Sequence, residues 1–361
     1  MTDHTFGAQL AAYKKLIDDD IATYADYLHT SASKQFGPAV AQEVDTFLDV
    51  LSRGGKRLRG ALVMVGYEMC GGTNKAMIIQ AARAIEMLHA YMLIVDDIQD
   101  RSPLRRGKPS AHVMLAAWHR AQKLKGDPDH FGMSVALDAA YGGAHAAQAI
   151  LANMDADPQL KLNVLSITNR TLSITAHGQT QDMVNAASAH PTSQDIEHVL
   201  EWKSALYSFI NPLHVGMVLA GAGCEATDAI TPYATHLGKA FQIIDDIEGI
   251  FGSAKEQGTS PLDDILEGKM TILTHYALAH ASATDAAFLR SCLGNQQLTA
   301  KDFAHCKQVL ESSGARAFAA KIAATQSAQA LEALDVAKGL WDEQGSAFLR
   351  ALVGTFQDRA K

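Results

Sequence analysis

Proline is missing from two long spans of this chain, which has 361 residues and only nine prolines. No proline lies between Pro38 and Pro103 or after Pro261. Proline removes a backbone N–H and breaks helix interiors, so proline-free sequence rich in Ala, Leu, Met, Gln and Lys favours helices. Apolar residues also recur every three or four positions, which is the helical period. Two such stripes are Ile85, Leu88, Met92 and Val95, and Trp341, Phe348, Leu352 and Phe356.

Helix boundaries can be predicted from local signals. Thr192 with Asp195, and Thr299 with Asp302, resemble capping boxes at helix starts. Gly314 interrupts the last third of the chain between two helical runs, and loops are expected at 125–128, 155–158 and 186–192. No run alternates apolar and polar residues between hairpin turns. We therefore predict one all-α domain over 1–361.

Charge and composition exclude several functions. The net charge of −8 argues against a nucleic-acid-binding surface, which is normally basic. The four cysteines are widely spaced, as in reduced thiols of a cytoplasmic protein. The first residues carry no signal-peptide pattern, and no uninterrupted apolar stretch of about 18 residues predicts a membrane span. Phosphate-loop, dinucleotide-binding, zinc-protease and serine-hydrolase motifs are absent.

Two acidic clusters stand inside apolar sequence. The first is Asp96-Asp97-Ile98-Gln99-Asp100, where Asp96 and Asp100 are one helical turn apart and project from one face. The second is Asp245-Asp246-Ile247-Glu248. Mg²⁺ is typically held by one or two such carboxylates together with substrate phosphates. A solvated helix face is the ordinary alternative for either cluster alone, but two clusters in apolar helices favour a metal–phosphate site.

Two basic clusters accompany them. Arg105-Arg106-Gly107-Lys108-Pro109 follows the first acidic cluster, and Gly54-Gly55-Lys56-Arg57-Leu58-Arg59 precedes it. Arginine binds phosphate bidentately, and glycine lets the backbone approach an anion closely. Either cluster alone is more often a turn with solvated charges. Together with the carboxylates, they predict two phosphorylated substrates, one bound through metal and one by cations alone.

In these motifs the chain resembles the trans-isoprenyl diphosphate synthases, or polyprenyl synthetases, of short-chain type. The resemblance runs from about Phe47 to about Leu273. Besides the four clusters, it includes Glu86–His89, His177–Asp182, Lys203–Leu206, Phe241–Asp246 and Asp264–Thr271. It implies a single-domain helical bundle around a central apolar cavity, with a motif-bearing core at about 47–273 and C-terminal helices at 274–361. The function it implies is Mg²⁺-dependent head-to-tail condensation of isopentenyl diphosphate with an allylic diphosphate.

The resemblance also implies a role for each matching residue. Asp96, Asp100 and Asp245 would bind Mg²⁺, with three ions expected and Mn²⁺ as a substitute. The allylic diphosphate would be contacted by Arg105, Lys203, Ser204, Gln242, Lys255 and Lys269. Isopentenyl diphosphate would be held by Lys56, Arg59, His89 and Arg106. The residues expected to carry catalysis are Asp96, Asp97, Asp100, Arg105, Lys203, Gln242, Asp245 and Asp246. A homodimer is expected as well.

Product length is expected to depend on the side chains one turn before the first acidic cluster. Met92 precedes Asp96 by one turn, and Tyr91 is its neighbour. In the family, bulky residues here form the floor of the product cavity. We therefore expect a C20 product, or else C15.

Two departures from the family pattern concern glycine. Gly249 stands where the second acidic motif usually has a third Asp, and Gly60 replaces a common proline. Two other functions stay open. A terpene cyclase shares the first acidic motif but does not need the basic clusters. A non-catalytic subunit of a heteromeric synthase would tolerate the weakened second motif.

Overall fold

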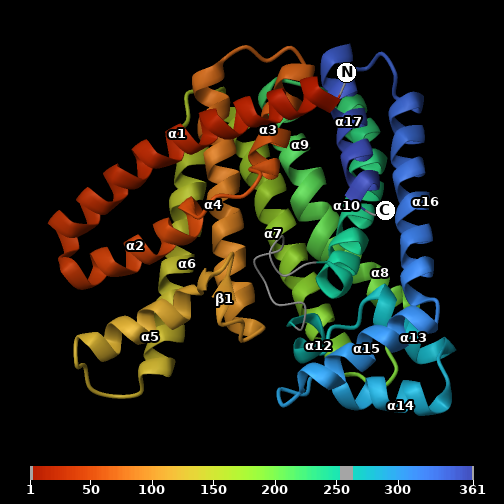
Figure 1. Ribbon diagram of the computed structural model, residues 1–361. Coiled ribbons are helices and arrows are strands. Elements are labelled where there is room, and N and C mark those ends of the chain that lie inside the picture. Colours follow the sequence, from red (N-terminus) through yellow and green to blue (C-terminus); the bar gives the residue numbers. More distant parts are fainter. Residues whose placement is uncertain (1–2, 253–262, 360–361) are drawn as a thin grey trace. The chain divides into compact units, whose positions relative to one another are not determined.

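The computed structural model describes residues 3–252 and 263–359, and helices dominate this part of the chain (Figure 1). The all-α class predicted from the sequence is confirmed. The helices are α1 (Asp3–Phe36), α2 (Pro38–Ser52), α3 (Leu58–Met69), α4 (Lys75–Gln99), α5 (Ala111–Ala121), α6 (Pro128–Asn153), α7 (Pro158–Ala187), α8 (Ser193–Val199), the π-helix η1 (Leu200–Ile210), α9 (Asn211–Leu219), α10 (Cys224–Phe251), α12 (Asp263–Glu267), α13 (Ile272–His280), α14 (Ala283–Cys292), α15 (Ala300–Ser312), α16 (Ala315–Val336) and α17 (Glu343–Arg359).

The chain divides into two compact units. We call residues 4–166 with 214–221 the N-terminal unit, and residues 167–213 with 222–361 the C-terminal unit. The boundaries fall inside α7 and α9, so these two helices contribute to both units. The single domain over 1–361 stays a prediction.

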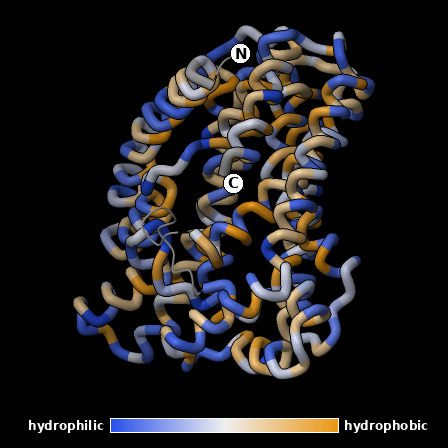
Figure 2. Tube along the Cα trace, turned by 45° about the vertical axis from the view of Figure 1, so that its right-hand side comes forward, coloured by the Kyte–Doolittle hydropathy of each residue, from blue (hydrophilic) through white to orange (hydrophobic). Residues whose placement is uncertain are grey.

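The N-terminal unit is built around α4, which packs against α3 and α6, while α6 also contacts α2 and α5. Small residues let these helices approach closely. A Cβ on Gly143 would lie only 2.0 Å from the Phe47 ring, so α6 can contact α2 there only with glycine. Figure 2 shows hydrophobic and hydrophilic positions alternating along the helices, as expected for helices that bury one face.

Helix α4 is long and apolar enough to cross a membrane by length and composition, with a mean hydropathy of 1.4. Arg83 and Glu86 interrupt it, which is why no unbroken apolar stretch is visible in the sequence. Because 61% of the apolar window is buried inside the protein, the helix fits a core position, and no membrane span is established.

The C-terminal unit is built around α10, which packs against η1 and α16. Gly238 of α10 allows the close contact with η1, since a Cβ there would lie 2.4 Å from the Ala205 backbone. The two predicted capping boxes are present, Thr192 with Asp195 and Thr299 with Asp302. Gly314 adopts the left-handed conformation that begins α16, as its position between two helical runs indicates.

One hairpin departs from the all-helical prediction. Strands β1 (Leu104–Arg105) and β2 (Lys108–Pro109) pair antiparallel around Arg106 and Gly107. Both turn residues have positive φ, 54° and 72°, as in a type I′ turn. The hairpin is too short to give an alternating pattern, and it contains the whole basic cluster Arg105–Pro109.

Candidate active site

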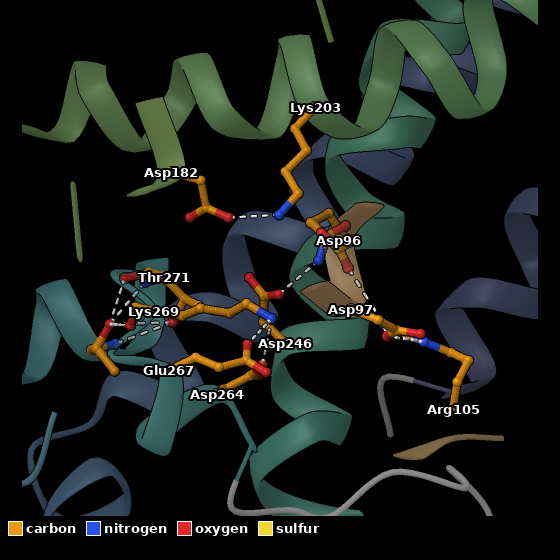
Figure 3. Close-up of polar contacts among 12 residues, drawn as sticks. Asp96, Asp97, Arg105, Asp182, Lys203, Asp246, Asp264, Glu267, Lys269 and Thr271 are labelled. Atoms are coloured by element: carbon orange, nitrogen blue, oxygen red, sulfur yellow. Dashed lines mark hydrogen bonds and ion pairs between the residues drawn. The ribbon is translucent and has the colours of Figure 1, made fainter. Parts of the chain in front are cut away.

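The first acidic cluster ends α4. Asp96 is partly exposed, and its carbonyl accepts a 2.8 Å bond from the N–H of Asp100, the C-cap residue. Asp97 is fully buried and accepts from Arg105 Nε at 2.8 Å and from Arg105 Nη2 (Figure 3). Arg105 Nη2 also lies 3.4 Å from Asp96 Oδ2. The middle carboxylate therefore anchors Arg105, while Asp96 and Asp100 are the more accessible pair.

Electrostatics in this cluster follow from burial. Desolvation raises the pKa of Asp97 to about 6, although Arg105 opposes the shift. Burial disfavours the charged form of Arg105 too, but Asp97 outweighs it and raises the pKa of the guanidinium. Near neutral pH the pair is an ion pair held inside the protein.

The two basic clusters meet in the N-terminal unit. Arg106 Nη1 donates to the carbonyl of Gly54. Gly55 has a φ of 107°, a conformation that favours glycine, and a Cβ there would lie 2.8 Å from Arg106 Nη2, so a side chain would displace the guanidinium. Lys56, the next residue, is exposed.

His89 and Arg59 join this basic group. Arg59 Nη1 lies 3.3 Å from His89 Nε2. Burial, reinforced by the positive charges of Arg59 and Arg106, holds the pKa of His89 well below its usual range. The imidazole is therefore neutral at physiological pH, and its ring nitrogen can accept from Arg59.

Arg53 is a structural member of this region that sequence reasoning missed. Its side chain is 1% exposed and pairs with Asp49 at 2.6 Å. It also donates to the carbonyls of Arg105, at 3.2 Å, and Pro109, at 2.6 Å. Arg53 thus fastens the hairpin to the end of α2. Its place directly before the glycine pair was the available signal.

The residues expected to control product length lie on α4 in the same unit. Tyr91 and Met92 are both partly buried. Burial raises the pKa of Tyr91, and the neighbouring phenol of Tyr141, on α6, adds to the shift.

In the C-terminal unit, Lys203 of η1 forms a 2.7 Å ion pair with Asp182 of α7 (Figure 3). Asp182 belongs to the recognised His177–Asp182 motif, although no role was assigned to it from the sequence. Gly178, in the same motif, permits this pairing, because a Cβ there would lie 2.6 Å from the Lys203 backbone nitrogen. The π-helical winding of η1 is itself a frequent feature of functional sites.

A hydrogen-bonded chain leads to the second acidic cluster. Ser204 Oγ donates to Gln242 Oε1 at 2.8 Å, and Gln242 Nε2 donates to Asp246 Oδ1 at 2.8 Å. Burial, with the charge of Asp264 next, raises the pKa of Asp246 to about 8. Asp245, its neighbour, is partly exposed. The predicted residues Ser204, Gln242 and Asp246 therefore lie together.

Lys269 lies between two carboxylates, 3.4 Å from Asp264 and 2.5 Å from Glu267 (Figure 3). Asp264 also lies over Gly249, where a Cβ would be 2.8 Å from its Oδ2. The sequence gave Asp264 no role, and only its place in the Asp264–Thr271 motif could have indicated one. Lys255, predicted to contact the allylic diphosphate, lies outside the described residues.

Buried polar atoms on α7 were also missed. Both amide atoms of Gln179 and the hydroxyl of Thr175 have no hydrogen-bond partner among the residues at 3–252 and 263–359. Gln179 lies in the same motif as Asp182 and is 7% exposed. Buried amides are normally paired, so this one stands out as a functional candidate.

No group of three or more His, Cys, Asp or Glu side chains is arranged as a metal site within the described parts of the chain. The chemistry of the donors nevertheless fits Mg²⁺. Asp96, Asp100 and Asp245 are partly exposed carboxylates, and Mg²⁺ prefers one or two of these with phosphate and water completing its shell. Such a site does not require three protein ligands in one place.

The arrangement is that of an all-α protein with two separate acidic clusters and cations beside each. The family model of polyprenyl synthetase matches residues 41–310. The chain belongs to this family, whose prenyl diphosphate synthases are prenyltransferases and use a divalent metal for diphosphate binding.

Named relatives agree with this assignment. A geranylgeranyl diphosphate synthase of Saccharolobus solfataricus is 29% identical over 297 residues, covering 81% of this chain and 84% of the relative. A geranylfarnesyl diphosphate synthase of Aeropyrum pernix is 32% identical over 237 residues, which cover 65% of this chain and 70% of the relative. The geranylgeranyl pyrophosphate synthase of Corynebacterium glutamicum, solved with isoprenyl diphosphate and magnesium, has a TM-score of 0.90 at 28% identity, covering 96% and 98%.

Proposed function

We propose that this protein condenses isopentenyl diphosphate with an allylic diphosphate to give a short-chain all-trans prenyl diphosphate, releasing diphosphate. One observation carries the proposal. The tight turn at Arg106–Gly107 sends two neighbouring arginines to different partners, Arg105 to the carboxylates of Asp96 and Asp97 and Arg106 to the Gly54 carbonyl. One hairpin thus serves two anion sites, one beside carboxylates and one beside glycine backbone.

The carboxylate side is assigned to the allylic diphosphate. Asp96, Asp100 and Asp245 would hold Mg²⁺, with three ions, and Mn²⁺ would substitute. When bound, the metal supplies positive charge that neutralises the departing diphosphate. Arg105, Lys203, Lys255 and Lys269 would add positive charge at the same leaving group. Asp97 and Asp246 support this set, since one anchors Arg105 and the other ends the Ser204–Gln242 chain.

The glycine side is assigned to isopentenyl diphosphate. Lys56, Arg59 and Arg106 would bind its diphosphate without metal, and neutral His89 would orient Arg59. Once the allylic C–O bond has ionised, the alkene of isopentenyl diphosphate attacks the cation. A proton is then lost to the released diphosphate. Gln179 and Thr175, whose polar atoms are buried, would stabilise the allylic cation through their oxygen dipoles.

Product length is assigned to Tyr91 and Met92, with C20 preferred to C15. Tyr91→Ala is expected to lengthen the product by at least one C5 unit, because one helical turn of about 5.4 Å is similar to one extended isoprene unit. Chromatography of dephosphorylated products measures this. A product profile identical to that of the unmodified protein would remove Tyr91 from the role.

The molecule is proposed to act as a cytoplasmic homodimer. The support is the set of widely spaced, unbridged cysteines and the large apolar side chains exposed on α6 and α7.

Product analysis tests the proposed function. Purified protein would be incubated with Mg²⁺, isopentenyl diphosphate and, separately, C5, C10 and C15 allylic diphosphates. The expected result is one dominant prenyl diphosphate, lost in Asp96→Ala and retained in Asp155→Ala, an exposed loop residue. Cyclic hydrocarbon from an allylic diphosphate alone would identify a terpene cyclase. Activity only with a second polypeptide would identify a heteromeric subunit.

A further inference from the structure

Helix α1 precedes the region matched by the polyprenyl synthetase family, yet it contacts the first basic cluster directly. We propose that Asp18 and Ile17 of α1 are positioning residues for isopentenyl diphosphate, because they fix the connection that carries Lys56 and the start of α3, which carries Arg59. The inference rests on the proposed function, which assigns Lys56 and Arg59 to that substrate.

Arg57 is the residue through which α1 acts. Its φ of 50° places it in the left-handed region, which a non-glycine residue keeps only when its surroundings hold it there. Its side chain is 4% exposed, so it faces inward while its neighbour Lys56 is exposed. Arg57 is therefore an internal anchor between two substrate-binding residues, Lys56 and Arg59.

Asp18 makes the shorter of the two ion pairs that hold this anchor. Arg57 Nε lies 2.8 Å from Asp18 Oδ1, whereas Arg57 Nη1 lies 3.4 Å from Glu86 Oε2. A third bond runs from Arg57 Nη2 to the Leu51 carbonyl at 2.8 Å. Removing the Asp18 charge would leave a buried guanidinium with only the longer carboxylate contact, which weakens its fixed geometry.

Ile17 makes a second contact, with Gly60 in the first turn of α3. Its side chain is fully buried, and a Cβ on Gly60 would lie 2.8 Å from Ile17 Cδ1. The Gly60 N–H donates to Glu86 Oε1 at 2.8 Å, a bond that proline could not make. Glycine in place of the common proline is therefore matched to both α1 and Glu86.

Other contacts hold α1 independently of Asp18. Asp20 pairs with Arg83 at 2.6 Å, and the Arg83 guanidinium lies 4.1 Å from the centre of the Tyr24 ring. Tyr13 donates to Glu68. Docking of α1 and positioning of the connection can therefore be separated, and Asp20→Asn is a matched control that breaks an ion pair of the same helix without touching the connection.

The test compares the full-length protein with Asp18→Asn and Asp20→Asn. Binding of isopentenyl diphosphate is measured by calorimetric titration, without allylic substrate or metal. Compared with the unmodified protein, Asp18→Asn is expected to bind about tenfold more weakly, whereas the affinity of Asp20→Asn should stay within about twofold. In steady state, the KM for isopentenyl diphosphate rises in Asp18→Asn, while the KM for the allylic substrate and kcat stay within about twofold. Asp18→Glu is expected to recover part of the affinity.

Ile17→Val provides a milder variant if Asp18→Asn does not fold. We expect it to raise the KM for isopentenyl diphosphate about threefold. Unchanged binding in Asp18→Asn, or equal weakening in Asp20→Asn, overturns the positioning role and leaves the proposed function intact. Failure of the unmodified protein to bind isopentenyl diphosphate overturns both.

Discussion

A single side chain, Asp264, changes how the second acidic motif should be interpreted. Gly249 stands where a third Asp is usual, and Asp264 occupies the space beside it, since a Cβ on Gly249 would meet its carboxylate at 2.8 Å. Asp264 is also the strongest charge raising the pKa of Asp246. The missing carboxylate is thus replaced in position by one from α12, and Gly249 provides the room for it.

Restoring the usual motif is therefore expected to harm the enzyme. Gly249→Asp would displace Asp264 and add a negative charge beside Asp246, so kcat should fall about tenfold or more. The double variant Gly249→Asp with Asp264→Ala removes the conflict and should recover much of the loss. Steady-state kinetics over a range of Mg²⁺ concentration measures both. A single variant as active as the natural chain would disprove the argument.

His89 gives an expected dependence of stability on pH. Its pKa is depressed in the folded protein by burial and by Arg59, so the folded imidazole stays neutral where the unfolded one binds a proton, below about pH 6.5. The unfolded state then binds more protons, and acidification lowers the free energy of unfolding. Between pH 7.5 and 5.5, the melting temperature of the natural protein should fall more than that of His89→Gln. Parallel falls would contradict the assigned pKa shift.

At the residue scale, the motifs indicated which side chains to compare, and they did not indicate how each one is held. Arg59 contacts His89, and the assignment of these two residues to one substrate was expected from the motifs. The inward direction of Arg57 was not, because it depends on a left-handed backbone and on α1, which is far away in the sequence. Spacing along a chain does not contain such contacts.

At the scale of elements, helices were predictable because their signals are local. Capping residues and proline-free apolar stripes mark them, whereas the hairpin at 104–109 is too short to leave a pattern. The π-helical winding of η1, which packs against α8 and α10, has no local sequence signal either. These two irregular elements carry Arg105, Arg106, Lys203 and Ser204, so the unpredicted backbone is where the charged residues are placed.

The crossing of α7 and η1 depends on Gly178. In Gly178→Ala, the new Cβ would lie 2.6 Å from the backbone nitrogen of Lys203, so the two helices must separate. We expect this to lower the free energy of unfolding by about 1–3 kcal/mol. Lys203 would move from Asp182, and the KM for the allylic substrate should rise about tenfold.

Gly142→Ala is the matched control for this change, because its Cβ would lie 3.6 Å from Glu43 and fits. Alanine there should stabilise α6 by about 0.5–1 kcal/mol. Thermal melts and allylic KM values distinguish the two variants. Equal behaviour would show that the crossing does not control Lys203.

At the scale of the molecule, exposed apolar surface bears on assembly. Met133 and Tyr141 of α6, and Leu162 of α7, are 39%, 55% and 60% exposed. Exposed large apolar side chains can mark an interface, and most oligomers are symmetric dimers. A homodimer that buries these side chains would remove them from water.

Light scattering after size exclusion tests this assembly. The natural protein should have a mass of about 77 kDa, twice the 38.7 kDa of one chain. Tyr141→Arg combined with Leu162→Arg should give the mass of one chain, because a buried interface cannot accommodate two unpaired charges. Leu340→Arg, at a residue 39% exposed near the start of α17, controls for the added charge. If the paired variant kept the dimer mass, the interface would have to lie elsewhere; if the natural protein had the mass of one chain, each copy would have to bind both substrates alone.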